Sequence, residues 1–258
     1  MVVDFDPNIF TLGPIQVRWY GAMYVIGFML ANFLLKKLSE RGFFKVPKEK
    51  VDSLITICFI CMFLGARFAY VFIYNWGYYK NHLTELLSVW QGGLSFHGAV
   101  AGLSVGAYIF AKKNKISWSQ VLDNMVLAGT PGLFFGRMGN FINGELYGSI
   151  TDSSFGMIFP AGGPYPRHPS QLYEGITEGI LLSIILWLLL KKVRYYGVLA
   201  SVFLIGYGTF RFFVEFVREP DVQLGKVNGL NMGQWLCSIM VIVGITALIN
   251  VLRKKREN

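Results

Sequence analysis

NMGQWLCSIMVIVGITALINVL, residues 231–252, contains no charged side chain and decides the fold. A helix needs about 20 mostly apolar residues to cross the ~30 Å hydrocarbon core of a bilayer, and this stretch is long enough. Six further apolar segments precede it, at residues 19–35, 53–74, 95–111, 121–137, 171–190 and 197–217. The sequence therefore predicts an all-α integral membrane protein with about seven transmembrane helices.

The fourth segment differs from the others because Pro131 and Gly132 interrupt it. Proline removes a helical hydrogen bond, and helix breakers at membrane depth are tolerated where the freed backbone faces protein or a wet cavity. We therefore expect a broken helix over residues 121–137.

The composition agrees with a bilayer as the solvent. Of the 258 residues, 53% are hydrophobic and 15% are charged, where a soluble domain would carry about 25% charged residues. The net charge of +9 comes mostly from loops that follow alternate segments, at Lys36, Lys37, Arg41, Lys45, Lys48, Lys50, Lys112, Lys113, Lys115, Lys191, Lys192, Arg194, Arg253, Lys254, Lys255 and Arg256. Basic loops mark the cytoplasmic side, so we expect the N-terminus outside and the C-terminus in the cytoplasm. These charges form no basic face on a soluble domain, which argues against a nucleic-acid partner.

One membrane domain is predicted over residues 1–258, since no internal repeat is visible. Residues 1–18 are expected to form an arm at the membrane surface, because this stretch contains Pro7, Gly13 and Pro14. No cleavable signal peptide is expected, because residues 1–17 carry two aspartates and no Lys or Arg before the first apolar run. The long loops at about 75–94, 138–170 and 218–230 fall on the outer side and are expected to carry function.

The three cysteines lie inside apolar segments, which argues against a disulfide framework or a zinc site. Cys58 and Cys61 form a C-x-x-C pair, but a redox motif of this kind is expected near a βαβ pattern, which is absent. We interpret these thiols as small buried hydrophobic groups.

Charged residues inside apolar segments are costly and are therefore functional candidates. Arg67 and Arg211 are the clearest examples. Tyr207, Arg211 and Glu215 recur at i, i+4 and i+8, which places them on one helical face. Glu215 would orient the Arg211 guanidinium and leave the rest of its donor fork for an anion, with Tyr207 adding a hydroxyl. The alternative is an intramembrane ion pair that only holds two helices together.

A second polar cluster is GRMGNFINGELYG, residues 136–148. Its glycines indicate a compact backbone that lets a ligand approach closely. Arg137, Asn140, Asn143 and Glu145 are the polar residues of this stretch, and an arginine with an amide suits a phosphate or a glycerol hydroxyl. The alternative is a glycine-rich loop that packs against neighbouring helices.

Two histidines lie in polar islands and are candidate general bases: His97 in GGLSFHGA, residues 92–99, and His168 in RHPSQLYE, residues 167–174. Each is also compatible with a hydrogen-bonded structural role near a membrane interface. His82, in a polar loop, is given no role.

Six ordered motifs resemble those of the prolipoprotein diacylglyceryl transferases. They are RWYG at 18–21, GAR at 65–67, GGLSFHGA, GRMGNFINGELYG, RHPSQLYE, and RFFVEFVREPD at 211–221. The resemblance covers nearly the whole chain. One departure is Ala99, where the family commonly has a second glycine after the histidine.

The resemblance implies seven spans in the bacterial plasma membrane and an active site that opens to its outer side. It implies transfer of diacylglyceryl from phosphatidylglycerol to the lipobox cysteine of prolipoprotein signal peptides, with release of glycerol phosphate. Carried over by position, Arg137 and Arg211 handle the headgroup, and His97 is a possible base. Supporting roles fall to Asn140, Glu145, Tyr20, Tyr207 and Glu215. The implied partners are these two substrates and membrane lipids, and no metal or cofactor is implied.

As a mechanistic hypothesis, a thiolate attacks C3 of the diacylglycerol and a phosphate ester leaves. Arginine charge would raise the ionised fraction of the thiol and offset the charge that grows on the phosphate. Arginine is too basic to accept the proton, so His97 is the candidate acceptor, with another base or water as alternatives.

Two other functions remain open, an anionic-lipid transporter and a noncatalytic assembly factor. Release of glycerol phosphate in proportion to modified peptide distinguishes the enzyme from both.

Overall fold

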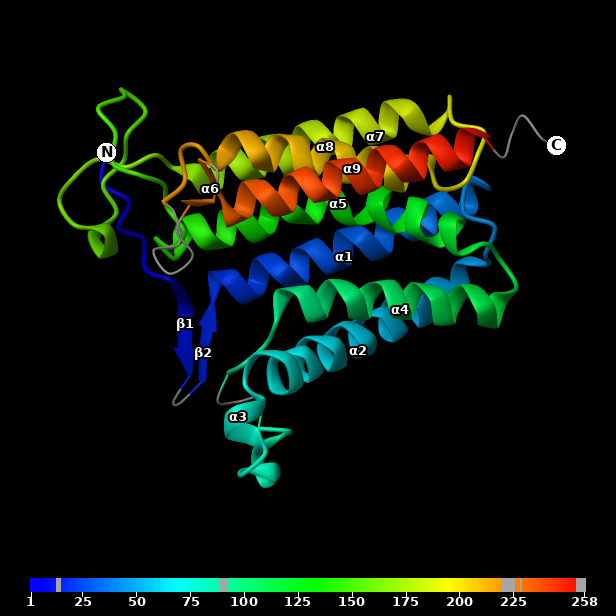
Figure 1. Cartoon of the computed structure of the whole chain (residues 1–258), viewed down its shortest axis with the longest axis horizontal. Helices are drawn as coiled ribbons and strands as arrows, with labels where there is room; N and C mark the ends of the chain where they lie inside the picture. Colours follow the sequence, from blue (N-terminus) through cyan, green and yellow to red (C-terminus); the bar gives the residue numbers. More distant parts are fainter. Residues whose placement is uncertain (13–14, 89–91, 220–225, 228, 254–258) are drawn as a thin grey trace. The chain divides into compact units, whose positions relative to one another are not determined.

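All seven apolar segments are helical in the computed structural model (Figure 1). The structure describes residues 1–12, 15–88, 92–219, 226–227 and 229–253. The helices are α1 (Trp19–Glu40), α2 (Val51–Ala69) continued by η2 (Tyr70–Tyr74), α4 (Phe96–Asn114), α5 (Trp118–Ile142), α6 (Ser170–Glu174) continued through η6 (Gly175–Leu181) into α7 (Leu182–Leu190), α8 (Val198–Val214) and α9 (Met232–Arg253). Short helical turns are η1 (Lys48–Lys50), α3 (Trp76–Tyr79), η3 (Leu83–Glu85) and η5 (Pro160–Gly162).

Among the residues that the structure describes, four helical stretches are long and apolar enough to cross a membrane: residues 19–40, 48–74, 170–190 and 232–253. Large apolar side chains on these helices are exposed, including Met29, Ile73, Leu188 and Ile242. Charged and amide side chains such as Glu174 are buried instead. This pattern is the reverse of that in a soluble protein and is typical of a membrane protein. Apolar side chains are stable in contact with lipid hydrocarbon, whereas polar and charged side chains are stable only where they face partners inside the protein.

In the described part of the chain, two short antiparallel hairpins accompany the helices. β1 (Asn8–Leu12) pairs with β2 (Ile15–Arg18), with Asn8 opposite Arg18. β3 (Lys226–Val227) pairs with β4 (Leu230–Asn231). The predicted arm thus contains a hairpin, while its residues 13–14 lie outside the described part of the chain, as do 89–91, 220–225 and 228 of the predicted loops.

The chain divides into two compact units, which are described separately. The first comprises residues 1–34 and 125–258, and the second residues 35–124. In the first unit α8 packs on both α7 and α9. α1 approaches α5 closely, because a Cβ at Gly27 would lie 3.4 Å from Cα of Gly132. In the second unit α2 and α4 pack along Gly65, Gly98 and Gly102, where an added Cβ would meet the facing backbone. Small residues allow such close helix packing in membranes.

The prediction of a broken fourth helix is wrong, since α5 runs unbroken from Trp118 to Ile142 with Pro131 inside it. Proline lacks the N–H that would bond the carbonyl four residues earlier, which is that of Leu127. Nε1 of Trp187 in α7 donates to this carbonyl at 3.1 Å. A side chain from a neighbouring helix therefore replaces the missing bond, and the helix continues.

An irregular turn occurs instead in the fifth apolar segment. η6 is a π-helical stretch between α6 and α7. It lies against α5 at Gly179, where a Cβ would lie 2.6 Å from the backbone N of Phe134. π-Helical turns are frequent at functional sites, and this one carries Glu178 next to the predicted site arginines, directly after Glu174 at the end of α6.

Candidate active site

Arg137 and Arg211, both predicted to handle the headgroup, meet on one buried carboxylate. Nη2 of Arg137 in α5 is 2.7 Å from Oε2 of Glu174. Nη1 of Arg211 in α8 is 2.7 Å from Oε1 of the same carboxylate. The Glu174 side chain is 1% exposed, whereas the arginine side chains keep 23% and 14% of their exposure. Glu174 thus holds the two guanidiniums together while part of each stays accessible.

Glu178, one helical turn after Glu174, is a second buried carboxylate. Its Oε2 is 3.8 Å from Nη2 of Arg137, and its Oε1 is 4.0 Å from Nη1 of Arg211. The predicted site residue Tyr207 lies close enough to Glu178 to interact with it electrostatically. Side chains from two helices, α5 and α8, therefore converge on the two carboxylates of α6 and η6.

Glu215, directly after α8, binds Arg211 as its spacing predicts. Oε1 of Glu215 is 2.6 Å from Nη2 of Arg211. Sequence reasoning did not foresee that Glu174 binds the other terminal nitrogen, so less of the donor fork is left for an anion than expected. Arg218 joins the same group, with Nη1 3.1 Å from Oε1 of Glu174 and Nε 3.9 Å from Oε1 of Glu215.

We call this group the arginine-carboxylate network, and its described members are Arg137, Arg211, Arg218, Glu174, Glu178 and Glu215. Its three guanidiniums and three carboxylates cancel in formal charge. An isolated charge buried in a low-dielectric interior is costly, whereas a paired and hydrogen-bonded one is tolerated. Removing any one member therefore leaves a charge without compensation.

Sequence reasoning missed Glu174 and Glu178 as site residues. Both lie at the start of the apolar segment 171–190. The rule that identified Arg67 and Arg211, a charge inside an apolar segment, applies to them equally. Their i, i+4 spacing also places them on one helical face. The partners across the helices were not readable from a single sequence.

A second polar group lies at the end of α5, and Arg137 and Asn140 share its face at i, i+3. Nδ2 of Asn140 donates to Oε1 of Glu145 at 2.9 Å, and Nδ2 of Asn143 donates to the same oxygen at 3.2 Å. Tyr20 of α1 lies near Asn140 and Glu145, and its hydroxyl is 3.0 Å from that of Tyr24. The predicted residues Tyr20, Asn140 and Glu145 therefore form one cluster that continues the face of Arg137.

The start of α9 supports Glu215 from the other side. Nδ2 of Asn231 donates to Oε2 of Glu215 at 3.1 Å. Oδ1 of Asn231 accepts from the N–H of Gln234 at 2.7 Å, and Oε1 of Gln234 accepts from the N–H of Asn231 at 3.1 Å. This reciprocal pair is a capping box, which satisfies two N–H groups at the helix start. The side-chain amide of Asn231 thus caps the N-terminus of α9 and also donates a hydrogen bond to Glu215.

His97 lies in the second unit, near the start of α4. Its exposed side chain has Nδ1 3.1 Å from the hydroxyl of Tyr74. Both residues line an apolar groove of about 880 Å³ along α2 and α4. The proposed role of His97 as the base stays a prediction.

His168 is held in a structural position. Its Nδ1 is 3.3 Å from the hydroxyl of Tyr173, and its carbonyl accepts from the N–H of Gly148 at 2.8 Å. These contacts favour the hydrogen-bonded structural role over a general base.

Arg67, the other intramembrane arginine, holds a loop. Its guanidinium donates to the backbone carbonyls of Glu85, Leu86, Gly92 and Gly93 at 2.8 to 3.1 Å. The side chain is buried, and the rings of Tyr70 and Tyr79 lie within 5.9 Å of it. Its donors are largely used within the protein, which favours a structural role.

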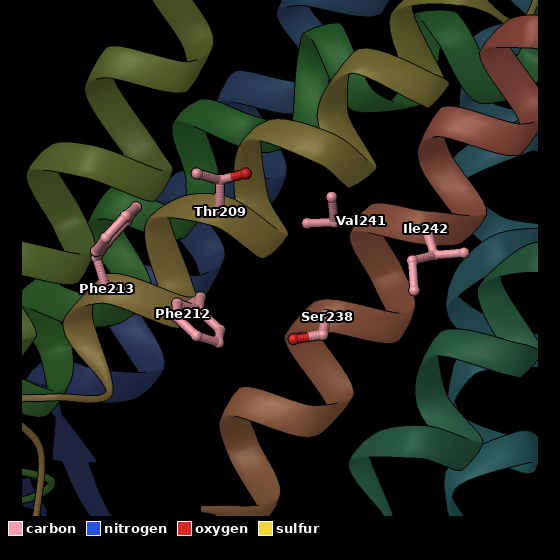
Figure 2. Close-up of a pocket in the computed structure, with 6 residues that line it drawn as sticks. All are labelled: Thr209, Phe212, Phe213, Ser238, Val241 and Ile242. Carbon is pink, nitrogen blue, oxygen red and sulfur yellow. The ribbon is translucent and has the colours of Figure 1, made fainter. Parts of the chain in front are cut away.

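A pocket of about 300 Å³ between α8 and α9 is apolar, and Figure 2 shows the six residues that line it. Its two hydroxyls are bonded within their own helices, Thr209 to the carbonyl of Ile205 and Ser238 to that of Gln234. Phe212 and Val241 contribute to its apolar wall. The pocket offers no charged group to a headgroup, so we place the candidate site at the arginine-carboxylate network.

A family model described as prolipoprotein diacylglyceryl transferase matches residues 7–250. The chain belongs to this family. It is 46% identical over 248 residues to a phosphatidylglycerol-prolipoprotein diacylglyceryl transferase of Desulfotalea psychrophila, covering 93% of this chain and 91% of that protein. It is 43% identical over 251 residues to the protein of that name from Geobacter sulfurreducens, covering 97% and 96%. A further relative of the same name, from Nitratidesulfovibrio vulgaris strain DP4, is 43% identical over 245 residues, covering 94% and 93%.

These comparisons confirm the family resemblance that the six motifs indicated. As a prolipoprotein diacylglyceryl transferase family member, the protein is a membrane-embedded transferase. The arginine-carboxylate network lies within the matched residues, as do His97 and the cluster around Asn140.

Proposed function

We propose that this protein transfers the diacylglyceryl group of phosphatidylglycerol to the lipobox cysteine of prolipoproteins. The thiolate sulfur forms a thioether bond with C3 of the glycerol backbone. The bond from C3 to the phosphate oxygen breaks, and glycerol phosphate leaves with the electron pair. This would be the first step of bacterial lipoprotein maturation. The observation that carries the proposal is the pair of partly exposed guanidiniums, Arg137 and Arg211, fixed by the buried Glu174.

The two arginines supply what the displacement needs. A phosphodiester binds to guanidinium N–H groups through charge-assisted hydrogen bonds. A free thiol has a pKa of ~8.5, and nearby positive charge raises its ionised fraction at neutral pH. Donors that are already fixed stabilise the charge on the departing phosphate without reorganisation, with added force where water is excluded. The cluster of Tyr20, Asn140 and Glu145 is suited to hold glycerol hydroxyls.

The proposed topology has seven spans in the bacterial plasma membrane, with the active site facing the outer side. Basic residues follow α1, α4, α7 and α9, which supports a cytoplasmic position for these helix ends. Arg137 lies near the end of α5, and Arg211 near the end of α8. Glu174 ends α6, just after the loop that joins it to α5. In this topology all three residues lie toward the outer leaflet, where an exported signal peptide can reach them.

The test is turnover by the purified protein with phosphatidylglycerol and a lipobox peptide, beside an Arg211→Ala variant. The peptide mass and released glycerol phosphate are followed together. We expect a diacylglyceryl mass gain that needs the peptide cysteine, matches the released glycerol phosphate and is lost in the variant. Folded wild-type protein that moves lipid without releasing glycerol phosphate would instead support a lipid transporter.

A further inference from the structure

The two buried glutamates of η6 and α6 differ in how tightly they are paired. Glu174 has three guanidinium nitrogens within 3.1 Å, from Arg137, Arg211 and Arg218. Glu178 is equally buried, yet its nearest guanidinium nitrogens are 3.8 and 4.0 Å away. By the hydrogen-bond criterion, both Oε1 of Glu178 and Oε2 of Glu174 lack a partner among the described residues. The distances to the arginines separate the two residues: Glu174 is the closely paired counterion, and Glu178 is the more loosely paired carboxylate.

The surroundings of Glu178 hold it in place beside the arginines. The charged and titratable groups that face it are Arg137 of α5, Glu174 of α6, Tyr207 and Arg211 of α8, and Cys237 of α9. The next residue, Gly179, packs directly on the backbone of Phe134, so that η6 lies in close contact with α5.

The reaction needs a proton acceptor close to the arginines. The thiol must lose its proton as sulfur attacks, and guanidinium groups cannot accept it. The arginine-carboxylate network is neutral in formal charge, so a phosphodiester bound there adds one negative charge. Uptake of one proton by a network carboxylate would offset that charge. Protonation of Glu174 would weaken three close ion pairs with arginines. Protonation of Glu178 would weaken only two longer ones.

We propose that Glu178 is the catalytic proton acceptor for the substrate thiol. The S–H bond breaks and its proton passes to the Glu178 carboxylate through an intervening water molecule, because Oε1 is buried in the unliganded protein, while the electron pair of the bond stays on sulfur. Sulfur then displaces the phosphate at C3, and the proton on Glu178 passes to the departing glycerol phosphate or to water. This inference rests on the proposed function and names the proton acceptor of that reaction. His97 is the competing candidate for the same role.

A selenocysteine lipobox peptide separates this role from a structural one, because a selenol is ionised at neutral pH without a base. Glu178→Gln keeps the shape of the side chain and removes its ability to accept a proton. With the cysteine peptide we expect it to lose at least ~100-fold in kcat. The KM for phosphatidylglycerol is expected to change less than it does in Glu174→Gln, because Glu174 contacts the guanidiniums more closely. With the selenocysteine peptide its rate should return to within ~10-fold of the wild-type rate on the same peptide.

Glu174→Gln and His97→Gln are measured beside it. Glu174→Gln disturbs the arginines, so we expect a loss on both peptides. Recovery of His97→Gln but not of Glu178→Gln on the selenocysteine peptide would overturn the proposal in favour of His97. Undiminished turnover of Glu178→Gln on the cysteine peptide would overturn it too, as would equal losses on both peptides. Wild-type protein that modifies neither peptide, under conditions that support a relative, would instead refute the proposed function itself.

Discussion

Glu174 binds more arginines than any other carboxylate of the network, with contacts to Arg137, Arg211 and Arg218. Arg211 in turn uses different nitrogens for Glu174 and Glu215. A planar guanidinium can bridge two carboxylates in this way, whereas a lysine ammonium is a point charge. The fork geometry, as well as the charge, is therefore needed at these positions.

We predict that Arg137→Lys and Arg211→Lys each lower turnover by at least ~100-fold, because an ammonium cannot hold both partners and still bind phosphate. Arg194→Lys, on an exposed loop, is the matched control and should behave as wild type. Turnover is measured by peptide mass, and folding by size-exclusion chromatography in detergent. Full activity in either folded site variant would show that charge alone suffices.

Glu174→Gln should also lower stability, because it leaves three guanidiniums with too few counterions. Removing one partner from a buried ion pair costs about 3 to 5 kcal/mol. Glu219 contacts Arg167 at the same 2.7 Å, but its side chain is 50% exposed, so Glu219→Gln should change stability by less than about 1 kcal/mol. Thermal unfolding in detergent compares the two variants. Similar unfolding midpoints would contradict the assigned role of burial.

At the level of elements, the sequence predicted where the helices lie, but it did not predict which side chains on different helices are in contact. Apolar length predicted all seven helical segments, and the i, i+4 spacing of Arg211 and Glu215 predicted their ion pair. The continuity of α5 through Pro131 depends on Trp187, a residue far along the chain that no local pattern connects to it. The pairing of Glu174 with Arg137 was hidden for the same reason.

The bond from Trp187 to Leu127 can be tested by a double-mutant cycle. We expect Trp187→Phe to destabilise the protein by about 1 to 2 kcal/mol, because the Leu127 carbonyl loses its donor. In a Pro131→Ala background the new N–H can bond that carbonyl, so Trp187→Phe should cost much less there. Equal costs in both backgrounds would mean that the tryptophan acts only through packing.

Gly179 sets the approach of η6 to α5. A Cβ there would lie 2.6 Å from the backbone N of Phe134, so Gly179→Ala must push the two elements apart. We expect a loss of turnover of at least ~10-fold, because misplacing catalytic groups by about 1 Å can cost 10²-fold. Gly129→Ala is the control within α5, since its Cβ meets nothing within 4 Å, and it should be neutral or stabilising. Kinetic assays of both variants decide the point, and equal activities would contradict it.

For the whole molecule, the distribution of basic residues predicts which loops face the cytoplasm, but it does not reveal how the site is assembled. Arg137, Glu174 and Arg211 come from three separate stretches, and only the packing of the first unit brings them together. Motif order pointed to two of the three. The third residue, Glu174, follows from charge balance, because two partly buried arginines need a counterion.

The proposed topology is tested by labelling cells with a membrane-impermeant maleimide. K113C should be protected, because Lys113 lies at the basic end of α4, while D152C in the loop after α5 should react. Both native residues are exposed, so burial does not explain a difference. The native cysteines lie within α2 and α9, and a variant without either substitution gives the background. Reaction at K113C but not at D152C would reverse the orientation.

Asn231 gives the last helix an importance beyond its hydropathy. The same side-chain amide caps α9 and holds Glu215, which in turn binds Arg211. α9 is therefore not an interchangeable anchor. A foreign membrane segment of equal length and hydropathy, grafted after residue 230, would keep the protein in the bilayer but leave Glu215 without its amide partner. Chimeras that exchange terminal helices between membrane enzymes should consequently be joined after the cap of this helix and not before it.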